Sequence, residues 1–441
     1  MAQNNSEKVK SECDFLKHDA NLNHDYQLVK SGKSVYNFKK HQLYNTTHNP
    51  IQNFFINPKN NYPSKPFGAN SNTYIDFELP QIQYTFYQFV LRFRLQNAGT
   101  VTQKLMPSPF IIDRISLLRN SNTFGIDVDS IDVLHYNLNK YFKEVEVGRN
   151  LSNVYANLGL QFGSGVLANN LSCINFDPTA MKDFNVELPI SLNRSLLPAC
   201  LIKDNLIIRV YFKNDIVYDG SPADMVLSDV NLVLRMEELN NNQLAHLYKQ
   251  PKFNHMFNKR IVQRFNINKL DAGIEVSVPL AGFRSIAGGL LAYLSYPLND
   301  IKSANHGGYQ YHLYQIAMDN VYIVDGTGRN IQNNNKQTKS WNNYLLPQKF
   351  GTFSEALNLL CYTTDALNEN KGMIYYLPFC ADGSDPYNGV YSGGYSFNTT
   401  SDHVFKFVPD NSYNGNVLLN VISFTPALIS LEGGSLNETY G

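Results

Sequence analysis

The sequence predicts an all-β protein, and three observations support this. From Asn72 onwards, short runs of alternating apolar and polar residues recur along the chain. Pro, Asn and Gly bound these runs, so that turns come about every eight to twelve residues, as in β-sandwiches and barrels. Aromatic residues make up 13% of the chain, and nearly all are Tyr or Phe, which suit a pleated and half-buried surface.

Composition narrows the functional class. The 441 residues are enough for two large β domains, and Lys plus Arg equals Asp plus Glu at 37 each. A neutral chain has no net field to attract a polyanion, so a nucleic-acid-coating role is disfavoured. The N-terminus MAQNNSEKVKSECDF lacks the apolar stretch of a secretory signal, and no run approaches the roughly 18 apolar residues of a membrane span.

The five cysteines are scattered and form no CxxC pair: Cys13, Cys173, Cys200, Cys361 and Cys380. An odd, widely spaced set on a chain without a signal predicts reduced thiols in a cytosol-like compartment. Sequons at Asn170 and Asn398 arise by chance in an Asn-rich chain, so they do not by themselves predict glycosylation.

Three segments are predicted. Residues 1–65 are polar and contain several prolines near their end, which indicates an N-terminal arm with at most a short helix near its start. Residues 66–255 are expected to form a first β domain and residues 256–441 a second one. The short helix and linker at 241–255 would join the two.

The first domain is expected to contain strands, one helix and then further strands. The strands are predicted at 73–80, 87–97, 110–120, 184–192, 205–212 and 229–239, with the helix at 129–142. Within 87–97 the alternation is clear. The core side is expected to hold Phe89, Leu91, Phe93 and Leu95, and the solvent side Gln88, Arg92, Arg94 and Gln96.

The same order of elements appears again in the second domain. Strands are predicted at 260–267, 274–280, 290–298, 314–328, 373–380, 403–409 and 417–424, and a helix at 353–367. Strands, one helix and strands, twice over, indicate an internal repeat at the level of structure, although no repeat of residues is visible.

Several short motifs suggest ligand chemistry, but each has a simpler structural interpretation. SGKS at 31–34 resembles the end of a phosphate-binding loop, yet Gln27 replaces the leading Gly, so a loop in the arm is predicted. Asp127, Asp129 and Asp132 lack the Gly and Glu of a calcium loop, and a strand end followed by a capped helix is predicted instead. DGTGRN at 325–330 is predicted to be a hairpin turn.

A glycine-containing stretch near the end of the chain, YSGGYSFNTTSDHVFKFVP at 391–409, raises the question of a ligand-binding loop. No phosphate-binding helix follows it, and apolar residues alternate at its end. Gly393 and Gly394 are therefore predicted to form a positive-φ turn between strands.

No catalytic, cofactor-binding or metal-binding residues are predicted. Four histidines lie in the arm at irregular spacing, which favours a solvated segment over a zinc site: His18, His24, His41 and His48. HExxH, GxSxG and paired CxxC motifs are absent from the sequence, and Lys and Arg form no stripe interleaved with aromatics. A structural or binding role is therefore favoured over catalysis.

Four stretches, in order along the chain, resemble double-jelly-roll major capsid proteins of DNA viruses. FGIDVDSIDVLHYNL is similar to the strand-to-helix step of their first barrel, and NVELPISLNRSLLPACLIKDNLIIRVYF to the closing strands of that barrel. MIYYLPFCADGSDPYNGVYSGGYSFNTTSDHVFKF and VLLNVISFTPALISLEGG resemble a strand with a Ser-Gly turn and the final strand pair. The Asn that follows the Ser-Gly turn is displaced to Asn398. The resemblance covers about residues 70–434.

This resemblance implies two consecutive eight-stranded jelly-roll barrels with short helices in the loops. It further implies a homotrimer that forms pseudo-hexagonal capsomers of an icosahedral virion, with no enzymatic activity and no cofactor. Expected partners are neighbouring capsomers, penton and minor capsid proteins and, through the arm, an internal membrane, without sequence-specific nucleic-acid binding. Assembly is expected in the host cytoplasm or in a viral factory.

Two other classes of function stay open from the sequence alone. A receptor- or carbohydrate-binding β-sandwich of the spike type would present Tyr and Asn side chains on its loops. A glycoside hydrolase would need two carboxylates held about 5–10 Å apart, which a sequence does not reveal. The subfamily is also open among a virophage-like or small eukaryotic virus and a tailless phage with an internal membrane.

Overall fold

The fold is described from a computed structural model of the chain. The described residues are 51–59, 65–66, 74–105, 111–129, 132–133, 136, 174–193, 195, 197–213, 217–249, 252–295, 318–333, 374–379, 394–397, 402–409 and 412–440. Within these ranges, no helix has the length and apolar character needed to cross a bilayer.

The described residues of the first half lie mainly in strands. These strands are β1 (Ile51–Ile56), β2 (Lys65–Pro66), β3 (Tyr74–Glu78), β4 (Tyr84–Asn97), β5 (Gln103–Leu105), β6 (Ile112–Arg119), β7 (Asn122–Asp129), β8 (Ile174–Phe176), β9 (Met181–Glu187), β10 (Leu206–Phe212), β11 (Val217–Asp219) and β12 (Met225–Glu238). Helical elements whose bounds lie within the described residues are η1 (Ala199–Leu201), η2 (Pro222–Asp224) and α7 (Asn241–Leu247).

Eight of these strands form two main antiparallel sheets, in the orders β1-β12-β4-β9 and β3-β10-β6-β7. β2 adds to β12, and a smaller sheet has the order β11-β5-β8. When the eight strands are counted along the chain, the two sheets read 1-8-3-6 and 2-7-4-5. Two Greek keys packed as a double sheet have this arrangement, which is a jelly roll.

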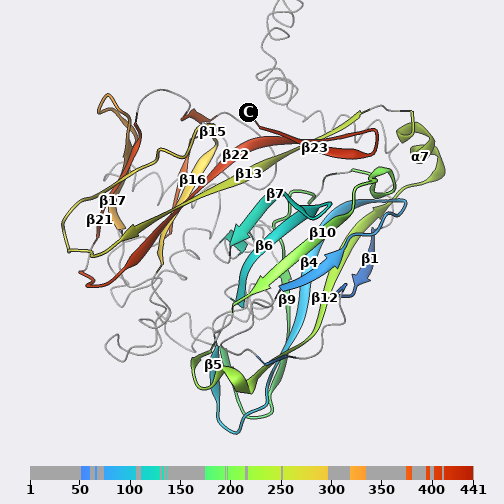
Figure 1. Cartoon of the computed structure of the whole chain (residues 1–441), viewed down its shortest axis with the longest axis horizontal. Coiled ribbons are helices and arrows are strands. Elements are labelled where there is room, and N and C mark those ends of the chain that lie inside the picture. Colours follow the sequence, from blue (N-terminus) through green and yellow to red (C-terminus); the bar gives the residue numbers. More distant parts are fainter. Residues whose placement is uncertain are drawn as a thin grey trace, which may run out of the picture.

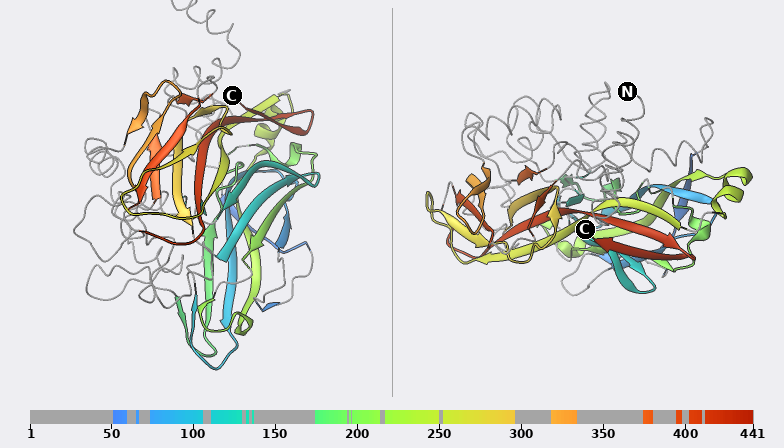
Figure 2. Two further views of the ribbon diagram at one scale, coloured as in Figure 1. Left: turned by 60° about the vertical axis from the view of Figure 1, so that its left-hand side comes forward. Right: turned by 90° about the horizontal axis from the view of Figure 1, so that it is seen from above.

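The second half repeats this topology. Its strands are β13 (Lys252–Ile267), β14 (Val276–Pro279), β15 (Ile286–Ala287), β16 (Gly289–Ser295), β17 (Met318–Val324), β18 (Asn330–Asn333), β19 (Ile374–Pro378), β20 (Tyr395–Ser396), β21 (Val404–Pro409), β22 (Val417–Glu432) and β23 (Ser435–Tyr440). The main sheets, β13-β22-β16-β19 and β14-β21-β17-β18, again read 1-8-3-6 and 2-7-4-5. The predicted repeat is thus confirmed as a repeat of topology, and the two sheet pairs lie side by side (Figures 1 and 2).

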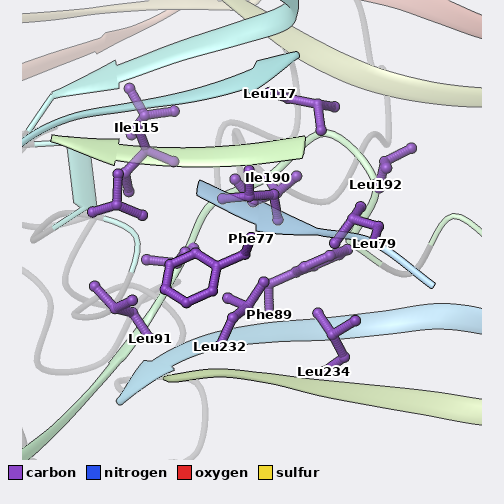
Figure 3. Packing of buried hydrophobic residues seen from close by; sticks show 14 of the residues in the cluster. Phe77, Leu79, Phe89, Leu91, Ile115, Leu117, Ile190, Leu192, Leu232 and Leu234 are labelled. Atoms are coloured by element: carbon purple, nitrogen blue, oxygen red, sulfur yellow. The ribbon is translucent and has the colours of Figure 1, made fainter. Parts of the chain in front are cut away.

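The core of the first half lies between its two sheets. Figure 3 shows Phe77, Leu79 and Ile115 from one layer facing Phe89 and Leu232 from the other. The predicted core side of β4 is confirmed, because Phe89, Leu91, Phe93 and Leu95 are all fully buried. Alternation of this kind puts every second side chain of a strand on the same face.

One residue on the predicted solvent side of β4 differs from expectation. Gln88 is only 8% exposed, because Arg235 on β12 donates to its Oε1 at 2.8 Å and Gln88 itself donates to Glu187 on β9. Cross-strand polar partners therefore cover this side chain, although it points away from the apolar core.

The structure also shifts some predicted boundaries. β1 lies inside the predicted arm of residues 1–65 and pairs along its whole length with β12. β13 begins at Lys252, so the predicted linker is shorter than 241–255, while its helix is confirmed as α7. The division at 255/256 remains a prediction.

Of the two longer helices predicted from the sequence, at 129–142 and 353–367, the described residues include only part of the first. In the predicted helix 129–142, Asp132, Val133 and Tyr136 are helical, and the rest lies outside the described residues apart from Asp129, which ends β7. The predicted helices near the start of the arm and at 353–367 also lie outside the described residues.

Candidate functional site

The short motifs weighed in the sequence are only partly covered by the described residues. Within the described part of the chain, no group of three or more His, Cys, Asp and Glu side chains is placed to hold a metal ion. Asp127 and Asp129 belong to β7, and Asp132 lies in the following helical segment. SGKS at 31–34, Gln27 and the four arm histidines lie outside the described residues.

The DGTGRN segment is a hairpin turn, as predicted. It joins β17 to β18, and the Asp325 carboxylate accepts hydrogen bonds from the backbone N–H groups of Thr327 at 3.0 Å and Arg329 at 2.9 Å. A hydrogen bond from the Thr327 hydroxyl, together with these two backbone hydrogen bonds, lowers the pKa of Asp325. Gly328 has a φ of +82°, which a glycine adopts without strain.

The glycine-containing stretch at 391–409 leads into strands. Gly394 directly precedes β20, which pairs with β15, and β21 follows from Val404. Gly393 lies outside the described residues. Cys200 is a free, half-buried thiol whose pKa is raised by burial, while the other four cysteines lie outside the described residues.

Buried polar and apolar contacts gather at the junction between the two halves. The junction is the contact of β13, β22 and β23 with the first jelly roll. These strands extend from the second half over the first, next to β6 and β7 (Figure 1). Phe253 and Phe257 of β13 belong to the first-half core, whereas Phe265, further along the same strand, packs on the second-half core. β13 therefore contributes to both cores.

β22 is shared in the same way. Val417, Leu419 and Val421 are buried in the second-half core, and Ile429 and Leu431 in the first-half core. Each fully buried aliphatic or aromatic side chain contributes about 1.5–3 kcal/mol. Because both long strands are shared, the two jelly rolls are held at one fixed orientation rather than joined by a flexible linker.

A buried histidine lies in the junction. His255 of β13 is 7% exposed, and its Nε2 lies 2.7 Å from the carbonyl oxygen of Ser191 in the first half. Because a carbonyl oxygen only accepts, Nε2 carries the proton and donates it. Burial lowers the pKa of His255 to about 4, so the ring is neutral at pH 7.

A buried ion pair lies further along β13. The Arg260 Nε is 2.6 Å from a carboxylate oxygen of Asp132, and both side chains are almost completely buried. The same guanidinium donates from Nη1 to the carbonyl oxygen of Pro189 at 3.1 Å. A buried charge is tolerated only when it is paired and hydrogen-bonded, so this pair favours one relative placement of the two halves.

Sequence reasoning missed this junction. It placed Asp132 near a helix start and considered it as a calcium ligand, and it singled out neither His255 nor Arg260. Alternation of Phe253, His255 and Phe257 was the available signal, since it extends the strand pattern back into the predicted linker.

No protein-family model matches the sequence, and no curated protein sequence matches it significantly. The similarity to solved structures is instead extensive and covers nearly the whole chain.

VP54 of PBCV-1, fitted into a reconstruction of the virophage Sputnik, has a TM-score of 0.60 at 11% identity, covering 90% of this chain and 98% of the other. The PBCV-1 virus capsid gives 0.59 at the same identity and coverage. The Faustovirus major capsid protein gives 0.56 at 11% identity, covering 88% and 91%. Together with the duplicated strand order, these matches show that the chain has the double-jelly-roll fold found in viral major capsid proteins.

Proposed function

We propose that this chain is a major capsid protein whose function is self-assembly into a virus shell. The observation that carries the proposal is the repetition of one jelly-roll topology within a single chain. Two solved structures named as capsid structures, the PBCV-1 virus capsid and the Faustovirus major capsid protein, support it, since each shares this fold over most of both chains. Fold alone does not determine function, so the proposal depends on the tests below.

The proposed assembly unit is a homotrimer. Two similar barrels per chain give six per trimer, which form a pseudo-hexagonal tile of an icosahedral shell. A closed threefold ring satisfies head-to-tail contacts without leaving a growing end. Obligate interfaces of this kind bury about 2,000–5,000 Å². A rigid junction suits this role, because a tile needs barrels at one fixed orientation.

The proposal assigns the chain no catalytic role and places it in the virion. Its partners are other copies of itself, with penton and minor capsid proteins at other positions of the shell. The neutral net charge supports a role that does not depend on coating nucleic acid.

The N-terminal arm is proposed to connect the tile to neighbouring tiles or to an internal membrane. Since β1 belongs to the first sheet, this role is assigned to residues 1–50 rather than to the whole of 1–65. A deletion that ends at residue 50 leaves the pairing of β1 with β12 in place.

Mass and copy number test the capsid proposal against a receptor-binding role. The chain of 50.1 kDa is expected to sediment as a trimer and to be the most abundant protein of purified particles. A minor particle component that sediments as a monomer contradicts the proposal and favours a spike-like protein.

A further inference from the structure

Residues 427–440 form a β-hairpin that belongs to a sheet of the second half and packs on the first half. This C-terminal hairpin comprises β22 from Ala427, the turn at Gly433 and Gly434, and β23. Both glycines have positive φ, +62° and +96°, as in a two-residue type I′ turn. The turn fixes the register of the hairpin, with Glu432 opposite Ser435.

The tip of the hairpin is hydrogen-bonded to a loop of the first half. The backbone N–H of Lys203 donates to the carbonyl oxygen of Gly434 at 2.8 Å. The N–H of Leu436 donates to a carboxylate oxygen of Asp204 at 2.7 Å, and the Leu436 carbonyl accepts from Nη1 of Arg119. Three polar groups of the first half therefore bind the backbone of the hairpin.

The loop that receives the tip is itself fixed. The second carboxylate oxygen of Asp204 accepts from Nδ2 of Asn120, in the β6–β7 turn, at 2.8 Å. Asn120 also exchanges hydrogen bonds with the backbone of Asn205 at 2.9 Å. The carboxylate thus connects two turns of the first half with the last strand of the chain.

A side chain at one glycine of the tip would displace the side chain of Lys203. A Cβ at Gly434 would lie 2.6 Å from Cδ of Lys203, whereas a Cβ at Gly433 would meet nothing within 4 Å. An Ala at either glycine is strained by the positive φ, but only an Ala at Gly434 would also displace Lys203 of the first half, and the φ of Gly434 lies further from the left-handed helical region near +60°. Gly433→Ala is therefore the milder comparison for Gly434→Ala.

The apolar side of the hairpin completes the first core. Ile429, Leu431 and Leu436 are at most 2% exposed, and all three belong to the first-half core. A second contact, the ion pair between Lys259 of β13 and Glu438 of β23 at 3.2 Å, holds the hairpin to its own sheet. The last strand of the chain is therefore part of the core built by the first half.

We propose that the C-terminal hairpin is a strap that locks the two jelly rolls into one cooperative unit. The first jelly roll then reaches full stability only after residues 427–440 have docked, because its core and the loop around Asp204 are otherwise incomplete. The contact between Leu436 and Asp204 joins residues 232 positions apart in sequence, so closing so long a loop makes it slow to form. The lock is a property of the single chain, and its test requires no assembly.

The test measures amide hydrogen exchange in full-length Asp204→Ala and Asp325→Ala. Each variant removes a carboxylate that accepts backbone N–H groups in a turn, but only Asp204 contacts the strap. The reporter is β4, in the sheet of the first half that does not contain residue 204 or its neighbours. Loss of a hydrogen bond to a charged group raises the equilibrium constant for opening of the structure by roughly tenfold or more. We expect Asp204→Ala to accelerate exchange in β4 by about this factor, and Asp325→Ala to leave it unchanged.

Further variants change the hairpin and leave Asp204 and its loop intact, so they test the role of the hairpin separately. Gly434→Ala is expected to accelerate exchange in β4 like Asp204→Ala, and Gly433→Ala to do so far less. A chain that ends at Glu432 is expected to lose protection in the first half before the second on heating. If the amides of β4 exchange at the wild-type rate in both Asp204→Ala and Gly434→Ala, the proposal is wrong. It is also wrong if the truncated chain melts in one transition at the wild-type temperature.

Discussion

Arg260 and Asp132 form a buried ion pair at 2.6 Å, although one lies on the first strand of the second jelly roll and the other in the first jelly roll. Removing one partner of such a pair leaves an uncompensated charge in the interior, which costs about 3–5 kcal/mol. We therefore expect Arg260→Met to lower the free energy of unfolding by this amount. Chemical denaturation followed by fluorescence measures the change.

The control for this variant is an exposed pair. Lys269 and Asp271 lie 2.7 Å apart with side chains 56% and 41% exposed, so Lys269→Met is expected to cost less than about 1 kcal/mol. Adding Asp132→Leu to Arg260→Met is expected to recover most of the lost stability, because no buried charge then remains. Equal effects of Arg260→Met and Lys269→Met contradict the role given to the junction.

The buried histidine predicts a pH dependence of stability. In the folded chain the pKa of His255 is lowered to about 4 from its ordinary value of 6.5. The unfolded chain therefore takes up a proton between pH 6.5 and 4 that the folded chain does not. The stability that His255 contributes is present above pH 6.5 and falls as the pH drops towards 4, by about 3 kcal/mol in total.

His255→Gln isolates this contribution. The amide keeps an N–H donor for the carbonyl of Ser191 and does not titrate. Melting temperatures of both proteins between pH 7 and pH 4 are expected to fall more steeply for the wild type, since carboxylates contribute equally to both curves. Parallel curves show that His255 does not carry this dependence.

Two phenylalanines test the assignment of the core. Phe89 on β4 is fully buried, and Phe55 on β1 is 60% exposed. Phe89→Ala is expected to cost about 3–5 kcal/mol, because it removes apolar contacts and leaves a cavity. Phe55→Ala is expected to change stability by no more than about 0.5 kcal/mol. A reversed order of the two effects contradicts the arrangement of the first sheet.

Deletion of residues 1–50 tests the proposed arm. The shortened chain is expected to form stable trimers that do not close into shells, since β1 remains while the connecting segment is lost. The control deletes residues 1–56, which also removes β1 and is expected to lower the melting temperature of the trimer. Closed shells from the first deletion, seen by electron microscopy, exclude the arm as the connection.

Local pattern predicted most of the individual strands, because alternation depends on residues close in sequence. In β4 the buried side of 89–95 follows directly from the sequence. The low exposure of Gln88 does not follow from the sequence of β4, because the residues that cover it, Arg235 and Glu187, come from other strands. For the same reason β1 was assigned to the arm, since its structure depends on β12.

The contacts at the junction do not follow from the pattern of residues close in sequence. Asp132 has an ordinary sequence context, and only the fold brings it to Arg260. Leu436 likewise appears as one apolar residue in a polar tail, yet it is fully buried in a core formed mainly by the first half. Contacts between the halves join distant segments, so they follow from topology rather than from composition or periodicity.

The most direct test of the central claim is an image of the particles or assemblies formed by this chain, reconstructed by electron cryo-microscopy. The account predicts a lattice of pseudo-hexagonal tiles, each a trimer with six barrel densities, into which two side-by-side jelly rolls per chain fit as a rigid unit. Tiles with a different number of barrels, or density for this chain only in spikes above a shell made of another protein, would contradict it.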